Sequence, residues 1–199
     1  MNELFIIDGN SLINRAFYAT PPLSNSKGQM TNAVYAFTNI LIKLIGDYNP
    51  AYLAVAFDMK AKTFRHEMFK DYKASRKGMP DELAEQLPLL KELLSAMNIT
   101  ILEQEGYEAD DIIGTLAKKF SNNTVIITGD RDALQLIDSS TKVFLTKKGL
   151  SEIDVVDEKN IVDILKFNLN KEGFETIEAY DGEQAIEKAL QKNPDLILL

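Results

Sequence analysis

Short apolar runs alternate along the chain with segments in which apolar residues recur at helical spacing. The runs are typical of strands buried on both faces, and they lie at residues 4–7, 52–57, 99–102, 125–128, 143–145 and 153–156. The helical patterns lie at residues 32–45, 81–94 and 109–120. Asp8, Gly9 and Asn10 follow the first run and predict a turn. This alternation predicts an α/β fold with a mostly parallel sheet and helices on both faces.

The same alternation continues after Asp157. Two more helices are predicted at residues 160–171 and 181–193, and two more strands within residues 174–180 and at 196–199. Because the last of these segments is almost wholly apolar, we expect it to form a strand buried between neighbouring strands.

Within the helical pattern at 81–94, Pro88 predicts a kink.

Acidic residues follow three of the predicted strands directly. Asp8, Asp58 and Asp130 each stand where an apolar run ends, and parallel strands place their carboxyl ends at one sheet edge, where ligands bind. Glu108 and Asp111 are three residues apart at a helix start and share a face of that helix. A single acid at a helix start is commonly only a cap, but capping alone does not account for so many. The candidate catalytic and metal-binding residues are Asp8, Asp58, Glu108, Asp110, Asp111, Asp130 and Asp132.

These residues offer a metal ion only oxygen ligands. The chain has no Cys and one His, His66, which has no second His to join it and is expected at the surface or at a phosphate. An all-oxygen site favours Mg²⁺ or Mn²⁺ over Zn²⁺. Carboxylates that hold paired hard cations serve phosphodiester hydrolysis, so the sequence predicts that chemistry. The chain has no Walker-type phosphate-binding motif.

Composition sets bounds on the fold and the compartment. The 199 residues, 45% of them hydrophobic, suffice for one large α/β domain or for one domain and part of another. The absence of Cys excludes disulfides and fits a reducing compartment. The start, MNELFIIDGN, lacks the features of a signal peptide, and no apolar run is long enough to cross a bilayer. We therefore expect a soluble, cytoplasmic protein with no membrane contact.

The net charge of −8 hides a local basic segment at residues 60–77. In it, Glu67 and Asp71 are opposed by Lys60, Lys62, Arg65, Lys70, Lys73, Arg76 and Lys77. A basic patch beside an acidic metal site would attract the backbone of a nucleic acid. Taken alone, the segment would favour the alternative of a solvated helix face.

Four segments of the sequence resemble, in order, the 5′-nuclease domain of bacterial DNA polymerase I. They are FIIDGNSLINRAFYA, AFDMKAKTFRHEMFKDYKASR, GYEADDIIGTLA and TGDRDALQL. The resemblance covers residues 1–156. It implies a Rossmann-like (PIN-like) core with a helical arch at residues 59–80, two or more divalent metal ions bound by the seven acids, and cleavage of 5′ ends and 5′ flaps of DNA.

The resemblance also implies DNA contacts within the arch. Its segment 64–76 resembles the passage for a 5′ single strand. Arg65, Lys73 and Arg76 resemble residues that steer the phosphates of this strand, with Lys77 beside them. Tyr72 is available for base stacking.

Residues from about 155 to 199 are similar to the first half of a response-regulator receiver domain. This similarity implies a flavodoxin-like α-β-α-β fragment at 157–199 that extends the nuclease sheet. The position of the phosphoacceptor Asp would follow Leu199, so no working phosphorelay receiver is expected. We interpret the chain as a chimera, engineered or recombined, and the alternative is a chain cut from a longer fusion.

Two functions from different classes follow. The first is a metal-dependent 5′-3′ exonuclease or 5′-flap endonuclease acting on DNA, impaired because the family's further metal-binding acids and its helix-hairpin-helix segment are not in this sequence. The second is a catalytically silent chimera of nuclease and receiver fragments. The C-terminal fragment would either join the nuclease sheet or pair with a second copy, which would give a homodimer.

Overall fold

The structure, a computed structural model, describes residues 3–74, 78–120, 123–147 and 152–198. The chain forms two compact units, Met1–Asp157 and Glu158–Leu199, which are described separately below. Arg76 and Lys77, two of the expected DNA contacts, lie outside the described residues. Within those residues, no helix is long and apolar enough to cross a membrane.

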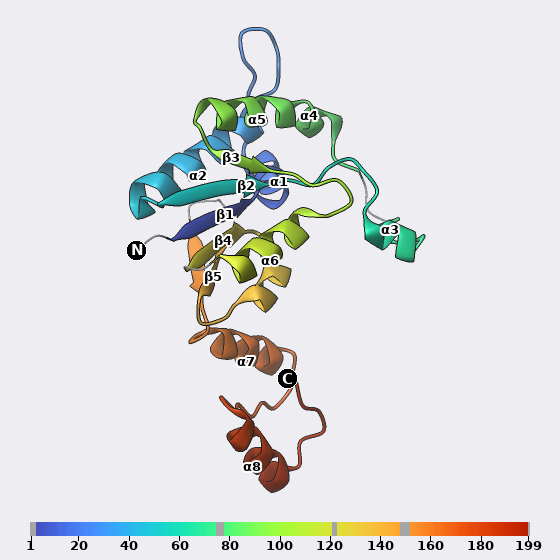
Figure 1. Ribbon diagram of the computed structural model, residues 1–199, viewed down its shortest axis with the longest axis vertical. Helices are drawn as coiled ribbons and strands as arrows, with labels where there is room; N and C mark the ends of the chain where they lie inside the picture. The colour runs from blue at the N-terminus through green and yellow to red at the C-terminus, as the bar shows by residue number, and fades with distance from the viewer. Residues whose placement is uncertain (1–2, 75–77, 121–122, 148–151, 199) are drawn as a thin grey trace. The chain divides into compact units, whose positions relative to one another are not determined.

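In the described part of the first unit, six strands form one sheet (Figure 1). They are β1 (Leu4–Asp8), β2 (Tyr52–Ala56), β3 (Thr100–Leu102), β4 (Thr124–Thr128), β5 (Thr141–Thr146) and β6 (Ile153–Val156). Their order is β3-β2-β1-β4-β5-β6, and all neighbours are parallel except β5 and β6, which are antiparallel. The mostly parallel sheet and its six predicted strands are confirmed. All five residues of β1 are buried, as expected for a strand covered on both faces.

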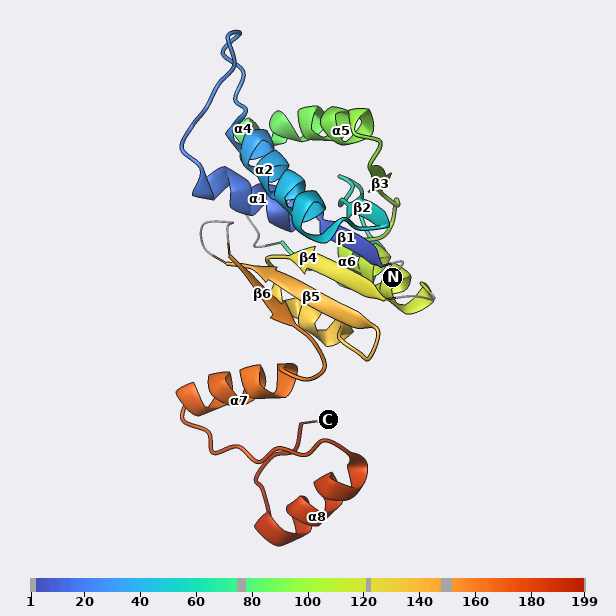
Figure 2. The same cartoon turned by 90° about the vertical axis from the view of Figure 1, so that its left-hand side faces the viewer.

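Helices cover both faces of this sheet (Figure 2). On one face lie α1 (Gly9–Ala19), α2 (Asn32–Tyr48) and α5 (Gln86–Ala96), which share an apolar cluster with Phe5. On the other face lie α6 (Ala109–Lys119) and the 3₁₀ helix η1 (Arg131–Leu136), which share a second cluster with Ile6. Phe5 and Ile6 enter different clusters because successive side chains of a strand point to opposite faces. These two cores fix the strand ends at the edge of the sheet.

Helix α1 stands where the sequence predicts a turn, so that prediction is wrong. Gly9 is a poor helix former, but the Asp8 side chain accepts a hydrogen bond from the backbone N–H of Ser11 (3.0 Å) and caps the helix. Gly9 is required at this position, because a Cβ there would lie 2.4 Å from the Phe57 ring. The strand therefore passes directly into a helix, and Asp8 stands at the junction.

The pattern predicted as one kinked helix at 81–94 forms two helices, α4 (Asp81–Ala84) and α5. The break falls at Glu85, before Pro88. In a continuous helix the Pro88 ring would clash with the carbonyl of Ala84, four residues earlier, and Pro88 has no N–H to donate. Pro88 instead occupies the first turn of α5, where backbone N–H groups have no partner within the helix, so the missing N–H costs no hydrogen bond.

The described part of the basic segment contains one short helix, α3 (Phe64–Met68). His66 caps it, since its Nδ1 accepts a hydrogen bond from the backbone N–H of Thr63 (3.1 Å). The N–H of Phe64 donates to the carbonyl of Gly106 (3.1 Å). This bond ties the start of α3 to the turn that precedes α6.

The second unit, taken by itself, contains α7 (Ile161–Lys171) and α8 (Gly182–Lys192) and no strand among residues 158–198. The predicted α-β-α-β fragment is therefore wrong in both of its strands, within 174–180 and at 196–198. Leu196 and Leu198, expected to be buried, are 75% and 70% exposed. A strand needs a neighbour for its backbone groups, and the six strands of the described sheet all come from the first unit. The expected extension of that sheet by residues 157–199 is not found in the part of the chain that the structure describes.

Candidate active site

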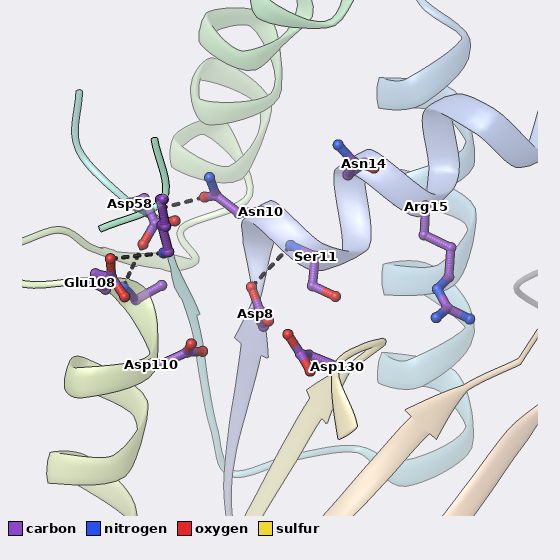
Figure 3. Close-up of a pocket in the computed structure, with 11 residues that line it drawn as sticks. Asp8, Asn10, Ser11, Asn14, Arg15, Asp58, Glu108, Asp110 and Asp130 are labelled. Carbon is purple, nitrogen blue, oxygen red and sulfur yellow. Dashed lines mark hydrogen bonds and ion pairs between the residues drawn. The ribbon is translucent and has the colours of Figure 1, made fainter. Parts of the chain in front are cut away.

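A cavity of about 460 Å³ opens at the carboxyl end of the central strands (Figure 3). Asp8 is the last residue of β1, and Asp58 and Asp130 follow β2 and β4 by two residues each. Glu108 and Asp110 come from the N-terminal end of α6. These five carboxylates line the cavity together with Asn10, Ser11, Asn14, Arg15, Lys73 and Ala109. The acids that follow parallel strands thus meet at one edge of the sheet, as the topology requires.

The other two predicted acids, Asp111 and Asp132, do not line this cavity. They border a second cavity of about 370 Å³, which Asp8, Asp110 and Arg65 also line. Asp132 is exposed, whereas the Asp111 carboxylate is bound by Arg65. The structure therefore divides the seven acids between two adjoining cavities that share Asp8 and Asp110.

Asp8 is held in place by hydrogen bonds from two directions. One carboxylate oxygen accepts from the backbone N–H of Ser11 (3.0 Å), and the other accepts from the hydroxyl of Thr128 (2.7 Å). The same Thr128 oxygen accepts from the backbone N–H of Asp130 (3.0 Å). One hydroxyl at the end of β4 thus fixes the positions of two acids of the cavity.

Asp58 joins the end of β2 to the start of α6. Its carboxylate accepts a hydrogen bond from the backbone N–H of Ala109 (2.7 Å), one of the first N–H groups of α6. Its own backbone N–H donates to the side-chain oxygen of Asn10 (3.0 Å). A carboxylate at a helix N-terminus is stabilised by the helix dipole, which lets acids gather here.

Three residues of the basic segment contact the acids of α6. Both oxygens of Asp111 accept from the Arg65 guanidinium, at 2.7 Å each. One oxygen of Glu108 lies 2.8 Å from Nζ of Lys73, and the other accepts from the Tyr72 hydroxyl (3.1 Å). Arg65, Tyr72 and Lys73, predicted as DNA contacts, therefore stand at the rim of the acid site with their polar groups turned toward it.

Sequence reasoning missed Ser11 and Arg15, which hold the turn that carries Asp130. The Ser11 hydroxyl accepts from the N–H of Gly129 (3.0 Å), and Arg15 donates to the carbonyls of Gly129 (3.0 Å) and Thr146. A Cβ at Gly129 would lie 2.6 Å from Nε of Arg15, so this contact needs glycine. The signal was their spacing, because Ser11 and Arg15 follow Asp8 by three and seven residues and share a helix face with it.

Burial and negative charge raise two pKa values in the cavity. The pKa of Asp8 is raised to about 6, chiefly by loss of hydration and further by the charges of Asp110 and Asp58, while its two hydrogen bonds oppose the rise. Partial loss of hydration also raises the pKa of Asp110, and the charges of Asp58 and Asp130 raise it by smaller amounts. The pKa of Asp111 is lowered instead, chiefly by its hydrogen bonds from Arg65.

The donor chemistry of the cavity fits a hard divalent cation. Every acidic ligand is an oxygen, and a cation would offset the repulsion that raises the pKa values of Asp8 and Asp110. Among the described residues, no three His, Asp or Glu side chains lie close enough together to hold an ion as they stand. In this structure Glu108 is bound by Lys73, and Asp111 is bound by Arg65.

A mostly parallel α/β sheet with acids gathered at its carboxyl edge defines a PIN-like fold of the 5′-nuclease type. Residues 3–166 match the family described as the 5′-3′ exonuclease, N-terminal resolvase-like domain. The chain belongs to this family. The match runs past residue 156, where the sequence analysis placed the end of the nuclease core.

Known proteins similar to this chain agree with that assignment. DNA polymerase I of Geobacillus stearothermophilus is 47% identical over 165 residues, which is 81% of this chain and 19% of that polymerase. A bacteriophage T5 protein co-crystallised with metal ions has the same fold, with a TM-score of 0.60 and 20% identity over 81% of this chain and 59% of that one. A complex of the T5 flap endonuclease with DNA and metal ions gives a TM-score of 0.58 and 20% identity over 81% and 60%. The chain spans about a fifth of the length of the polymerase.

Proposed function

We propose that this chain is a metal-dependent 5′ nuclease that acts on DNA as a 5′-3′ exonuclease and 5′-flap endonuclease. The observation that carries the proposal is the convergence of five carboxylates in one cavity beside a basic segment. Membership of a family described by its 5′-3′ exonuclease activity supports it. So does the likeness in fold to a flap endonuclease that has been seen with DNA and metal ions.

The proposed metal ligands are the carboxylates of the two adjoining cavities, and the proposed ions are Mg²⁺ or Mn²⁺. Asp8, Asp58, Glu108, Asp110 and Asp130 would hold one ion, with Asp111 and Asp132 at its side. When bound, the cation supplies a Lewis acid for the phosphodiester and lowers the pKa of a water nucleophile. The likeness to a T5 protein crystallised with metal ions supports this choice of cofactor.

The residues of the basic segment bind and orient the DNA backbone in this proposal. Lys73 Nζ lies 2.8 Å from Glu108, and Nη1 of Arg65 lies 3.7 Å from the same carboxylate. These cations therefore stand where a phosphate would approach the acids. An arriving phosphate would accept charge-assisted hydrogen bonds that the carboxylates now receive, which also releases the acids for the metal ion. Arg76 and Lys77 extend the same basic patch in sequence.

We expect this activity to be weak, because Arg65, Tyr72 and Lys73 compete with a metal ion for Glu108 and Asp111. The alternative is a catalytically silent chimera whose residues 157–199 come from a receiver and pair two copies. Helices α7 and α8 lie where that alternative places them. The lack of its two strands among residues 158–198 and the family match through residue 166 favour the nuclease.

Cleavage of labelled flap substrates tests the proposal. With Mg²⁺, a duplex bearing a 5′ flap should release short 5′-labelled products, whereas a duplex bearing a 3′ flap of the same sequence should stay intact. EDTA should abolish the products. The silent chimera predicts no product above the EDTA control for either substrate, and equal cleavage of both flaps would contradict a 5′ nuclease.

A further inference from the structure

Two aromatic side chains remain at the surface beside the acid site. Phe64, the first residue of α3, is 40% exposed, and Tyr107, which directly precedes Glu108, is 51% exposed. Their ring centroids lie 5.9 Å apart with an interplanar angle of 56°. Single exposed aromatic side chains are ordinary, but two in contact, each next in sequence to a residue that lines a charged cavity, form a defined apolar surface.

The backbone holds this pair in position. The N–H of Phe64 donates to the carbonyl of Gly106 (3.1 Å), and the N–H of Tyr107 donates to the carbonyl of Gln104 (3.2 Å). Gly106 has a φ of +85°, which favours glycine in this turn. The guanidinium of Arg65 lies 4.6 Å from the centre of the Phe64 ring while it binds Asp111. These contacts bring the two rings together in the protein without a ligand.

The charges around the pair indicate the class of ligand. On the Phe64 side the basic segment attracts a polyanion, whereas the turn before Tyr107 carries Glu105 and would repel a phosphate. A ligand that satisfies both sides places its phosphates along the basic segment and a flat, uncharged ring on the aromatic pair. Single-stranded nucleic acid has this chemistry, because every base offers a π face.

Tyr72, the residue expected to stack on a base, is engaged in other contacts. Its hydroxyl donates to Glu108 (3.1 Å), and its ring stands edge-on to His66, with centroids 5.3 Å apart. We propose that Phe64 and Tyr107 form the base-stacking platform of this protein, and that they take an unpaired base of a DNA strand whose phosphates run along the basic segment. The platform rests on the proposed function, since it would seat a base next to the phosphodiester that the acids act on.

Binding of a labelled single-stranded oligonucleotide in EDTA tests the platform without cleavage. Two ligands of equal length are compared, a thymidine strand and an abasic strand with the same phosphates. The full chain should bind the thymidine strand more tightly than the abasic one. Tyr107→Leu and Phe64→Leu, which keep apolar volume but remove the π face, should each weaken binding of the thymidine strand about 5- to 10-fold and leave the abasic strand unchanged.

Two matched variants complete the design. Tyr107→Phe keeps the ring and should bind like the unmodified chain, whereas Tyr35→Leu removes a similarly exposed tyrosine from α2 and should have no effect. Equal weakening of both strands by Tyr107→Leu, no effect of either platform variant, or no binding of the thymidine strand to the full chain would overturn the platform. Base-dependent binding without flap cleavage in Mg²⁺ would refute the nuclease and keep the platform. Flap cleavage by the full chain, together with unchanged binding in the platform variants, would refute the platform and keep the nuclease.

Discussion

At the scale of single residues, the acids of the site also serve the fold. Asp8 ends β1, caps α1 and accepts the Thr128 hydroxyl, and Asp58 caps α6 while its backbone is bound by Asn10. These bonds fix the carboxylates without a metal ion, but they keep negative charge where burial opposes it. The resulting strain is electrostatic and is visible in the raised pKa of Asp8.

This strain predicts how the stability of the metal-free protein depends on pH. The pKa of Asp8 is raised from 3.8 to about 6 in the folded state, so the folded protein holds this proton more tightly than the unfolded chain. The contribution of Asp8 is therefore most favourable below pH 4, declines as the pH rises to about 6 and is constant above it. Asp8→Asn should remove this decline and raise the free energy of unfolding at pH 8 by about 1–3 kcal/mol.

Urea unfolding in EDTA at pH 4.5 and pH 8 measures this effect. The difference between Asp8→Asn and the unmodified chain should grow with pH. Asp47→Asn, on the exposed end of α2, provides the control and should leave the pH dependence as it is. If Asp8→Asn destabilises the protein equally at both pH values, burial of this charge is not a cost to the fold.

The sequence predicted that seven acids gather, and five of them line the cavity. It did not predict the side chains that hold them. Asp8, Asp58 and Asp130 could be found because each follows an apolar run, and parallel strands place their carboxyl ends at the same edge of a sheet. Asp111, one of the two acids outside the cavity, is bound by Arg65, which is distant in sequence. Pairs between residues so far apart in sequence can be recognised only in the structure.

At the scale of elements, the short helix α3 is tied to α6 by side chains rather than by a core. No residue of α3 is buried; the Arg65–Asp111 pair joins it to α6, and a backbone bond from Phe64 to Gly106 joins it to the turn before α6. An element held mainly by polar contacts opens with a small free energy. We therefore expect the basic segment to respond when its charged partners change.

Arg65→Ala should loosen the basic segment without affecting the sheet. Amide hydrogen exchange of residues 64–74 should become about 5-fold faster, which corresponds to roughly 1 kcal/mol for a partly exposed ion pair. Mn²⁺ should produce a change in the same direction in the unmodified chain, because it competes for Asp111 and Glu108. Lys70→Ala, in the same segment, is the control and should exchange like the unmodified chain. Unchanged exchange in Arg65→Ala would mean that the segment is held by other contacts.

Helices and strands could be predicted where the apolar pattern alone determined the secondary structure. The six strands follow from apolar runs, whereas α1 was missed because Gly9 and the polar residues after it resemble a turn. The cap by Asp8 and the buried face of Leu12, Ile13 and Ala16 support the helix that this stretch forms. The break before Pro88 was misplaced for a similar reason, since the constraint of a proline falls on the residue four positions earlier.

At the scale of the whole molecule, the described sheet is built from the first unit alone. All six strands and both apolar clusters come from residues 4–156. The strands predicted within residues 174–199 rested on apolar composition and on the similarity to a receiver domain. Composition does not show whether a partner strand is available, and among the described residues of that unit none is.

Removal of residues 158–199 should therefore leave a folded core. The fragment 1–157 should unfold cooperatively, with the same thermal midpoint as the corresponding transition of the full chain. Circular dichroism and calorimetry of the two proteins measure this. A fragment that is insoluble, or that melts without a cooperative transition, would show that the sheet depends on the second unit.

The central claim is that the carboxylates at the sheet edge hydrolyse DNA with a divalent cation. The most direct measurement is the rate of 5′-flap cleavage as Mg²⁺ is varied, for the unmodified chain, Asp130→Asn and the control Asp47→Asn. The account predicts saturable dependence on Mg²⁺, a loss of roughly 100-fold or more in Asp130→Asn, and an unchanged rate in the control. Cleavage that persists in EDTA, or a rate in Asp130→Asn equal to that of the control, would contradict it.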